Sequence, residues 1–207
     1  MNITEARSEA AALMRARETE PEHVLHVASL AMQLFDGLAP LHQLGPEDRL
    51  LLEAAGYLHD IGWSVSERDG AGHHKASARL IREHNWKALD ACEVNLVALV
   101  ARYHRKSLPE PGHLDFTALP AEDQRRVELL AAMLRIADGL DRTHRQWVQE
   151  VHCQIGAHQL ELRLVACAPV GAEISAAGKK ADLARRAFAR EVFVTIGREA
   201  FAAKLPE

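Results

Sequence analysis

The chain has 207 residues, and 48% of them are hydrophobic, which is enough to bury one sizeable core. Its formal net charge of −4 provides no overall basic field to recruit a nucleic acid duplex, and no apolar run reaches the length of a membrane span. The three cysteines show no paired spacing and the N-terminus does not resemble a signal peptide, so we expect a cytoplasmic protein.

The first two thirds of the chain show the apolar spacing of amphipathic helices. Pro21 suits the first turn of one helix, and Pro46 marks the start of another. Loops are expected at 66–72 and 107–120, where glycine, proline and polar residues gather. The pattern predicts helices over residues 4–19, 21–38, 45–62, 73–85, 90–106 and 121–145.

The periodicity changes after about Gln146. Residues 148–155 and 158–168 alternate apolar and polar side chains on either side of a short turn, which predicts a β-hairpin. Residues 178–192 return to helical spacing. The segment that follows, 192–197, fits either a third strand or the end of that helix.

These patterns predict a mainly α protein. We expect a helical domain over residues 1–145 and a small β-β-α extension over residues 146–207 that packs on it. The chain contains no internal repeat and no low-complexity tract. The sequence leaves the oligomeric state open, with a homodimer as one option.

The composition is unusual in its twelve histidines, and several of them lie near aspartates in the sequence. His59 and Asp60 end an apolar run in AAGYLHDIGW, where burying either group unpaired is costly. The candidates fall on different predicted helices, and a helix bundle can bring such groups to one interior point. Imidazole and carboxylate ligands suit one or two divalent ions of Mn, Fe, Co or Zn, with Mg as a further option. The candidate ligands are His23, His59, Asp60, His73 or His74, His104 and Asp138.

The order of these residues resembles the H…HD…D pattern of the HD-domain phosphohydrolase superfamily. The segment EHVLHVASLA is similar to that family's first element, which implies that His23 is the ligand and His26 its neighbour. The segment HHKASARLI in the same way favours His73 over His74. The resemblance implies an HD-domain helical bundle that binds divalent metal.

A closer resemblance covers about residues 22–194. The segments GHHKASARLIRE, LVARYHRKSLP, LLAAMLRIADGLDRTHRQ and KKADLARRAF are similar to the C-terminal HD-type domain of the exopolyphosphatase/guanosine-pentaphosphate phosphatase family. Members of that family carry actin-like lobes before this domain, and polyphosphate hydrolysis is attributed to those lobes. The sequence shows neither such lobes nor a Gly-rich phosphate loop, so we expect a stand-alone domain.

Three functions from different classes remain open on this basis. The first is a metal-dependent phosphohydrolase that acts on a phosphate ester or phosphoanhydride of nucleotide or polyphosphate type, which the full ligand set favours. The second is a non-catalytic module that binds polyphosphate or a guanosine polyphosphate. The third is a structural dimerisation domain without metal. We expect the partner to be a phosphorylated small molecule or polyphosphate, with no membrane and no nucleic acid duplex.

Roles in the enzymatic alternative follow from the ligand types. Asp60 is the ligand able to bridge two metal ions, and His73, His104 or a carboxylate could protonate the leaving oxygen. The expected catalytic residues are Asp60, His73 and His104. Cationic side chains next to the ligands are expected to bind substrate, because arginine forks match phosphate oxygens. These cations are Lys75, Arg102, Arg105, Lys106, Arg142 and Arg145.

Other polar and aromatic residues are expected to have structural roles. Asp141 is expected to cap a turn or to pair with a neighbouring arginine. We expect Tyr57, Trp63 and Trp86 to pack in the core. Solvated faces or loops are expected for His26, His42, His84, His113, His144, His152 and His158.

Overall fold

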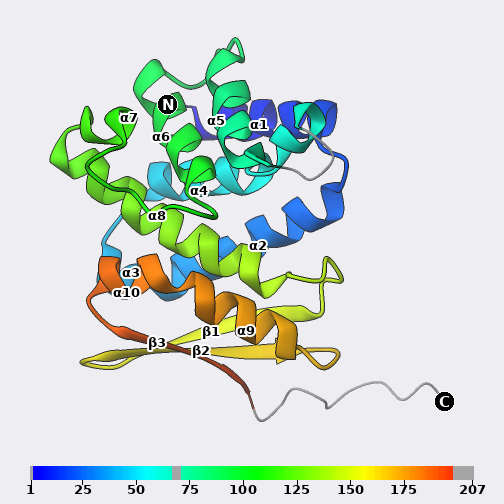
Figure 1. Cartoon of the computed structure of the whole chain (residues 1–207), viewed down its shortest axis with the longest axis vertical. Coiled ribbons are helices and arrows are strands. Elements are labelled where there is room, and N and C mark those ends of the chain that lie inside the picture. The colour runs from blue at the N-terminus through cyan, green and yellow to red at the C-terminus, as the bar shows by residue number, and fades with distance from the viewer. Residues whose placement is uncertain (1, 67–70, 198–207) are drawn as a thin grey trace.

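The computed structural model describes residues 2–66 and 71–197 and shows a body of helices beside a small sheet (Figure 1). Within these residues, all regular elements as far as residue 140 are helices. Three strands and two further helices follow. The prediction of a mainly α fold with a small C-terminal extension is confirmed. Residues 67–70 of the predicted loop and residues 198–207 of the predicted extension lie outside the described residues.

The body consists of α-helices joined by short loops and one 3₁₀-helix, η1, at Ile61–Val65. Its α-helices are α1 (Ile3–Arg17), α2 (Pro21–Gly37), α3 (Ala39–His42), α4 (Pro46–Leu58), α5 (His73–Glu83), α6 (Ala91–Arg102), α7 (Leu114–Thr117) and α8 (Ala121–Leu140). The C-terminal part holds β1 (Val148–Ile155), β2 (Gln159–Ala166), α9 (Gly171–Lys180), α10 (Asp182–Phe188) and β3 (Glu191–Ile196). None of the described helices is long and apolar enough to cross a bilayer.

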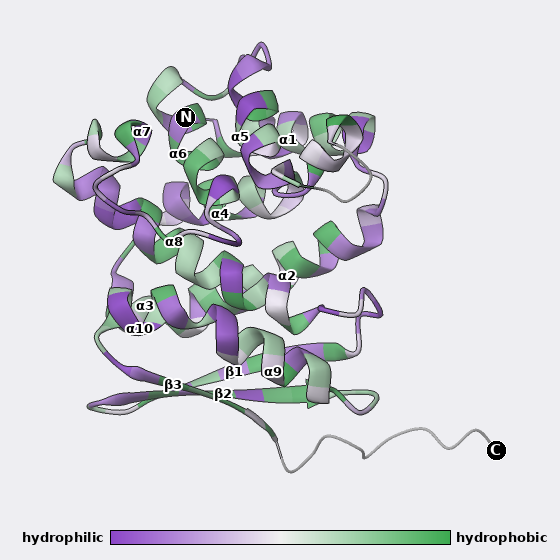
Figure 2. Cartoon of the chain, viewed as in Figure 1, coloured by the Kyte–Doolittle hydropathy of each residue, from purple (hydrophilic) through white to green (hydrophobic). Residues whose placement is uncertain are grey.

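Helix α8 runs through the middle of the protein and contacts α2, α4, α6, α9 and α10 (Figure 1). Its side chains Leu130, Leu134 and Ile136 are fully buried, and each such burial stabilises the fold by about 1.5–3 kcal/mol. Figure 2 shows hydrophobic and hydrophilic residues alternating along the helices and strands, as amphipathic elements require. One continuous core therefore joins the helical body to the C-terminal part.

The sheet has the strand order β1-β2-β3, with β1 antiparallel to β2 and β2 parallel to β3. Two parallel strands need a crossover connection, and α9 with α10 supplies it. Leu160, Leu162 and Leu164 alternate along β2 and are buried under these helices. Of the two structures expected for residues 192–197, the strand is the correct one.

Three helices end earlier than the sequence pattern predicts. They end at Leu58 rather than residue 62, at Arg102 rather than residue 106, and at Leu140 rather than residue 145. At two of these ends a histidine ring donates to a carbonyl oxygen that the next helical turn would use: His59 donates to Gly56, and His104 donates to Ala101. The predicted site residues thus terminate their own helices.

The predicted helix over 178–192 is also wrong, because the structure has two helices there that meet at Ala181. The first begins at Gly171, before the predicted start, and the second ends at Phe188. The side chain of Asp182 accepts a hydrogen bond from the Leu183 amide at the start of the second helix. That local bond replaces helical continuation at the junction.

Arg135 joins three parts of the fold from inside α8. Its guanidinium makes two hydrogen bonds to the Asp182 carboxylate of α10, at 3.0 and 2.9 Å, and a third to the Tyr103 carbonyl at 2.9 Å. Tyr103 follows α6 and directly precedes His104. Arg135 therefore holds the backbone that carries His104 against the C-terminal helices.

Replacing this guanidinium is expected to lower the free energy of unfolding by about 2 kcal/mol, because Arg135→Met leaves the Tyr103 carbonyl without its donor. Denaturant unfolding of the purified variant measures the loss. Arg163→Met is the matched control, since it breaks an exposed pair with Glu161 and should change stability little. Equal stability of the two variants would show that the buried bonds of Arg135 do not hold this junction.

Candidate functional site

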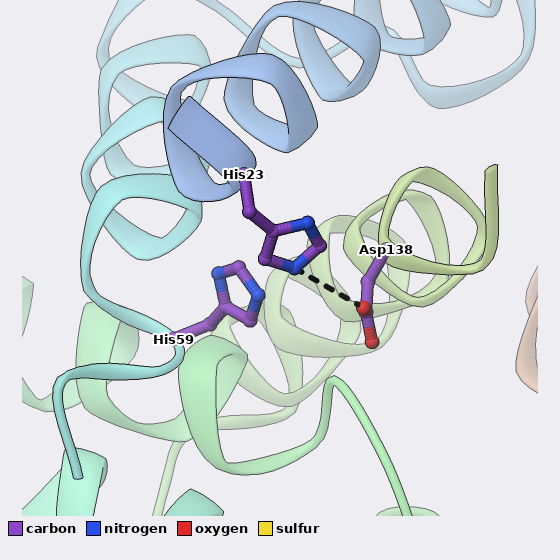
Figure 3. A group of neighbouring side chains, drawn as sticks. All are labelled: His23, His59 and Asp138. Atoms are coloured by element: carbon purple, nitrogen blue, oxygen red, sulfur yellow. Dashed lines mark ion pairs between the residues drawn. The ribbon is translucent and has the colours of Figure 1, made fainter. Parts of the chain in front are cut away.

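Six side chains from five parts of the fold converge at the end of α8. His23 lies in the first turn of α2, His59 follows α4, and Asp138 lies in the last turn of α8. Figure 3 shows these three side chains pointing toward one another from their separate helices. Asp60, His73 and His104 approach from the other side and come from the start of η1, the start of α5 and the end of α6.

The first group consists of His23, His59 and Asp138, whose potential ligand atoms all lie within 4.8 Å of one another. Nε2 of His23 is 3.8 Å from Oδ1 of Asp138, as the dashed line in Figure 3 marks. The His23 and His59 rings are 5.7 Å apart and meet edge to face. Two imidazole nitrogens and a carboxylate oxygen thus face a common point.

The second group consists of Asp60, His73 and His104, again with ligand atoms within 4.8 Å. Oδ1 of Asp60 is 3.1 Å from Nε2 of His73 and 3.5 Å from Nε2 of His104. Its other oxygen, Oδ2, is 3.8 Å from Nε2 of His59, which belongs to the first group. Asp60 therefore lies between the two groups, with one oxygen facing each.

The histidine rings are held from behind by hydrogen bonds of their Nδ1 atoms. His59 donates to the Gly56 carbonyl at 2.8 Å, and His104 donates to the Ala101 carbonyl at 2.7 Å. His23 donates to the Asp141 carboxylate at 2.8 Å. Because an acceptor behind each ring takes the Nδ1 proton, Nε2 carries a free lone pair toward the site. This arrangement is typical of histidines that ligate a metal.

Three polar atoms of the site are buried without a hydrogen bond of ordinary geometry in the described residues: His23 Nε2, His59 Nε2 and Asp60 Oδ1. His59 is 0% exposed, so water cannot reach its ring. Native proteins satisfy nearly all such atoms, because an unpaired buried acceptor costs about 1–3 kcal/mol. These three atoms are the ones that face the common points of the two groups, so a bound cation would satisfy them together.

Electrostatics inside the site favour charged carboxylates. Burial acts to raise the pKa of Asp60, but the neighbouring His59 and His73 outweigh it and hold that pKa well below its usual range. Burial likewise opposes ionisation of Asp138, and the nearby Lys180 ammonium is the largest contribution that lowers its pKa. Both aspartates are anions at neutral pH and are suited to a cation.

The pKa values of His23 and His104 are shifted in opposite directions. Burial acts to lower the pKa of His23, but its hydrogen bond with Asp141 and the charge of Asp138 raise it overall. For His104 burial dominates, and the charge of His59 adds to it, so the pKa lies well below the usual value. His104 is therefore neutral at physiological pH, with a lone pair on Nε2.

Gly62 and Ser77 fix the position of the two predicted ligands His59 and His73. The Ser77 hydroxyl donates to the His59 carbonyl at 2.6 Å and accepts from the Gly62 amide at 2.9 Å. A Cβ on Gly62 would lie 2.1 Å from the His73 carbonyl oxygen and 2.5 Å from the Ser77 amide nitrogen. Only glycine permits η1 to approach α5 this closely.

The six side chains lie beside a cleft of about 850 Å³, which His23, Asp60, His73, His104 and Asp138 help to line. Five cationic side chains surround it, and they come from the α6–α7 loop, the segment after α8, and α9. These cations are Arg105, Lys106, Arg142, Lys179 and Lys180. The lining also holds the carboxylates of Glu18, Glu20, Asp60 and Asp138. With a metal ion on the two aspartates, the five cations would suit a multiply charged anion such as a phosphate compound.

The structure places three of the predicted substrate cations outside the cleft lining. Arg102 lies near the Asp115 carboxylate and over the Tyr103 ring. Arg145 lies over the Trp147 ring, and Lys75 is exposed on α5. Aromatic faces and an acidic partner outside the cleft hold the two arginines.

The cleft also contains residues that sequence reasoning assigned elsewhere. Trp63 was expected in the core, but 40% of it is exposed, and its ring stacks on His73 with centroids 4.6 Å apart. His144 lies exposed in the loop after α8, as expected, and from there its ring stacks on His23 at 3.7 Å and bonds to Glu20. His73 rather than His74 faces Asp60.

One further expectation was incomplete and another was wrong. Asp141 accepts from the Gln146 amide, as a turn cap does, but its main partner is His23, and it is 1% exposed. His42 was expected on a solvated face and is buried, because its ring bonds to the Phe35 carbonyl and the Leu44 amide. The pairing of His23 with Asp141 leaves no trace in the local sequence, since the two residues are 118 positions apart.

Sequence reasoning did not single out Lys179 and Lys180. The only local signal is the pair of adjacent lysines in GKKADL, whose positions in a helix face different directions. Both line the cleft, and which of them reaches Asp138 depends on how α9 packs against α8. At that contact a Cβ on Gly139 would lie 2.7 Å from the Ala177 Cα, so the two helix backbones nearly touch.

Comparison with known proteins supports the second, closer resemblance seen in the sequence. No protein of curated function matches the chain. One family model does match, and it covers residues 7–182, from within α1 to the start of α10. The match thus includes all six clustered side chains and α9. That model is described as Ppx/GppA phosphatase, domain III, and the chain belongs to this family.

Proposed function

We propose that this protein is a metal-dependent phosphohydrolase of the HD-domain type, acting on a phosphate ester or phosphoanhydride of nucleotide or polyphosphate type. The observation that carries the proposal is the set of buried, unsatisfied acceptor atoms His23 Nε2, His59 Nε2 and Asp60 Oδ1 beside a cationic cleft. Membership of a phosphatase family supports the reaction class.

The residues fit a divalent ion in donor type, orientation and charge. The first group offers two imidazoles and one carboxylate, and so does the second. Such mixed nitrogen and oxygen sets suit Mn²⁺, Fe²⁺, Co²⁺ or Zn²⁺ better than Mg²⁺, which prefers oxygen ligands. His23, His59 and Asp138 would hold one ion, and Asp60, His73 and His104 a second, with Asp60 able to contact both.

A divalent ion, when bound, supplies Lewis acidity and lowers the pKa of water, which is the chemistry that phosphoester hydrolysis requires. The chain itself contributes charge and proton handling. Arg105, Lys106 and Arg142 line the cleft and bind the non-bridging phosphate oxygens, whose charge rises in the transition state. These cations also select phosphorylated compounds over neutral ones.

The histidines differ in the proton steps that they can perform. His104 has a lowered pKa and a free Nε2 lone pair, so at neutral pH it has no proton to supply and is suited to hold an ion. His73 lies at the cleft beside Arg105, whose Nη1 is 3.3 Å from its Nε2. Both His73 and His104 line the cleft, and where only the first group holds an ion, His73 is the histidine left to protonate the leaving oxygen.

The direct test is metal titration of the chelator-treated protein with Mn²⁺, Co²⁺ and Zn²⁺ by calorimetry, followed by turnover of an aryl phosphate, nucleotides and polyphosphate. We expect one or two ions to bind and at least one substrate to be hydrolysed. Affinity should fall as pH falls, because protons compete with the ion for the histidines, beginning with His23, whose pKa is raised.

Two outcomes would contradict this proposal. A protein that binds none of the three ions would exclude the metal site. Metal binding without turnover of any substrate, together with tight binding of polyphosphate or a guanosine polyphosphate, would instead support the non-catalytic binding module. A chain that neither binds metal nor binds these phosphates would favour a structural role.

A further inference from the structure

Lys180, the last residue of α9, places an ammonium group at the edge of the first ligand group. Its Nζ forms an ion pair with Oδ2 of Asp138, and its side chain is 25% exposed and lines the cleft. The other oxygen of Asp138, Oδ1, faces Nε2 of His23. The carboxylate is thus shared, with one oxygen toward the histidines and the other toward the lysine.

Contacts with α8 on either side of Lys180 hold it in this position. Just before it, α9 meets α8 where Gly139 allows the backbone at Ala177 to approach. Just after it, Asp182 is bound through both carboxylate oxygens to the buried Arg135 of α8. With an anchor on each side, the backbone at Lys180 is held against α8, and the ion pair with Asp138 places its side chain at the cleft wall.

An ammonium group has three donors, and Asp138 uses one of them in the structure. The exposed part of the Lys180 side chain faces the cleft, which Arg142 and Lys106 line from other elements. An anion in that cleft would meet cations from the helical body and from the C-terminal part at once. No comparable acidic partner in the described residues is recorded for Lys179, its neighbour in the cleft lining.

We propose that Lys180 is a substrate-contacting residue: Asp138 holds its ammonium at the cleft wall, where it donates hydrogen bonds to phosphate oxygens of a substrate bound at the histidine centre. The proposal rests on the proposed function and adds that the C-terminal part completes the phosphate site. It also makes Lys180 and the metal ion compete for the charge of Asp138.

Because Lys180 lies beside both Asp138 and the cleft, its removal should affect the binding of a divalent ion and of a phosphate anion in opposite ways. Removing the ammonium leaves the full charge of Asp138 to a divalent ion, so metal binds more tightly. The same change removes a donor to phosphate, so the anion binds more weakly. A lysine that only held α9 in place would, when removed, weaken the binding of both.

The test compares Lys180→Met with Lys87→Met, a control that removes the same charge from an exposed position far from the cleft lining. Calorimetry measures Mn²⁺ binding to the metal-free proteins and then inorganic phosphate binding to the loaded proteins. For K180M we expect several-fold tighter Mn²⁺ binding and phosphate binding weakened by about 10-fold or more, the effect of one charge-assisted hydrogen bond. Lys180→Arg keeps the charge and should recover part of the phosphate affinity.

Unchanged phosphate affinity in K180M would overturn the proposal, and so would a parallel loss of metal and phosphate affinity with a lower melting temperature. If the wild type binds no Mn²⁺, the metal site fails on its own. Lys180 is then judged by phosphate binding to the metal-free proteins, where equal affinity of wild type and K180M overturns it and weaker binding by K180M supports it.

Discussion

Asp60→Ala is expected to lower the affinity for every bound divalent ion by more than about 100-fold, beyond the effect of losing an outer-sphere partner. The reason is its position between the two groups, with Oδ1 at 3.1 Å from His73 and Oδ2 at 3.8 Å from His59. His59→Ala should be more selective and remove only the ion of the first group. Elemental analysis and calorimetric titration measure the affinity and the number of ions.

The matched control is His152→Ala, which removes an exposed imidazole from β1 and should leave metal binding unchanged. Comparison of the two site variants also counts the ions. A wild type that binds two ions should retain one in H59A and none in D60A. Wild-type metal content in both variants would disprove the ligand assignment.

Gly62→Ala is expected to destabilise the protein by about 3 kcal/mol, at the upper end of overpacking effects. The added Cβ would meet the His73 carbonyl oxygen at 2.1 Å and the Ser77 amide at 2.5 Å, and both are backbone atoms that cannot rotate away. Relief of the contact has to move α5 away from η1. Because α5 carries His73 and Ser77 positions His59, metal affinity should fall together with stability.

Denaturant unfolding with and without Mn²⁺ measures both effects for Gly62→Ala. Gly112→Ala is the control, because a Cβ at that exposed glycine has no atom within 4 Å. Its free energy of unfolding should stay close to that of the wild type. If G62A is as stable as G112A, the close approach of η1 to α5 does not constrain the site.

Which helices form, and which of them carry the site, could be predicted from the sequence. Apolar spacing and the prolines at positions 21 and 46 predict α2 and α4, because amphipathic periodicity and first-turn proline are local properties. The alternation in 148–155 and 158–168 likewise predicts the hairpin of β1 and β2. The grouping of ligand-type residues was visible because histidine and aspartate are rare in apolar runs.

The ends of the helices could not be predicted in this way. The apolar pattern continues past Leu58 and Arg102, because the residues beyond these ends are also buried. What stops each helix is a histidine ring that bonds backward to a carbonyl three residues earlier. That choice becomes favourable only when the rest of the site surrounds the ring.

The sequence by itself determined that the chain builds a helical body and supplies six ligand-type side chains, since both depend on residue type and local spacing. Only the tertiary structure decided which charges meet. His23 forms a hydrogen bond with Asp141, and Asp138 forms an ion pair with Lys180. Trp63 stacks on His73 instead of packing in the core. Each of these partners lies on another element, and its distance depends on how the helices pack. The last two of these contacts depend on the close approach of α8 and α9 at Gly139 and of η1 and α5 at Gly62, which no local pattern encodes.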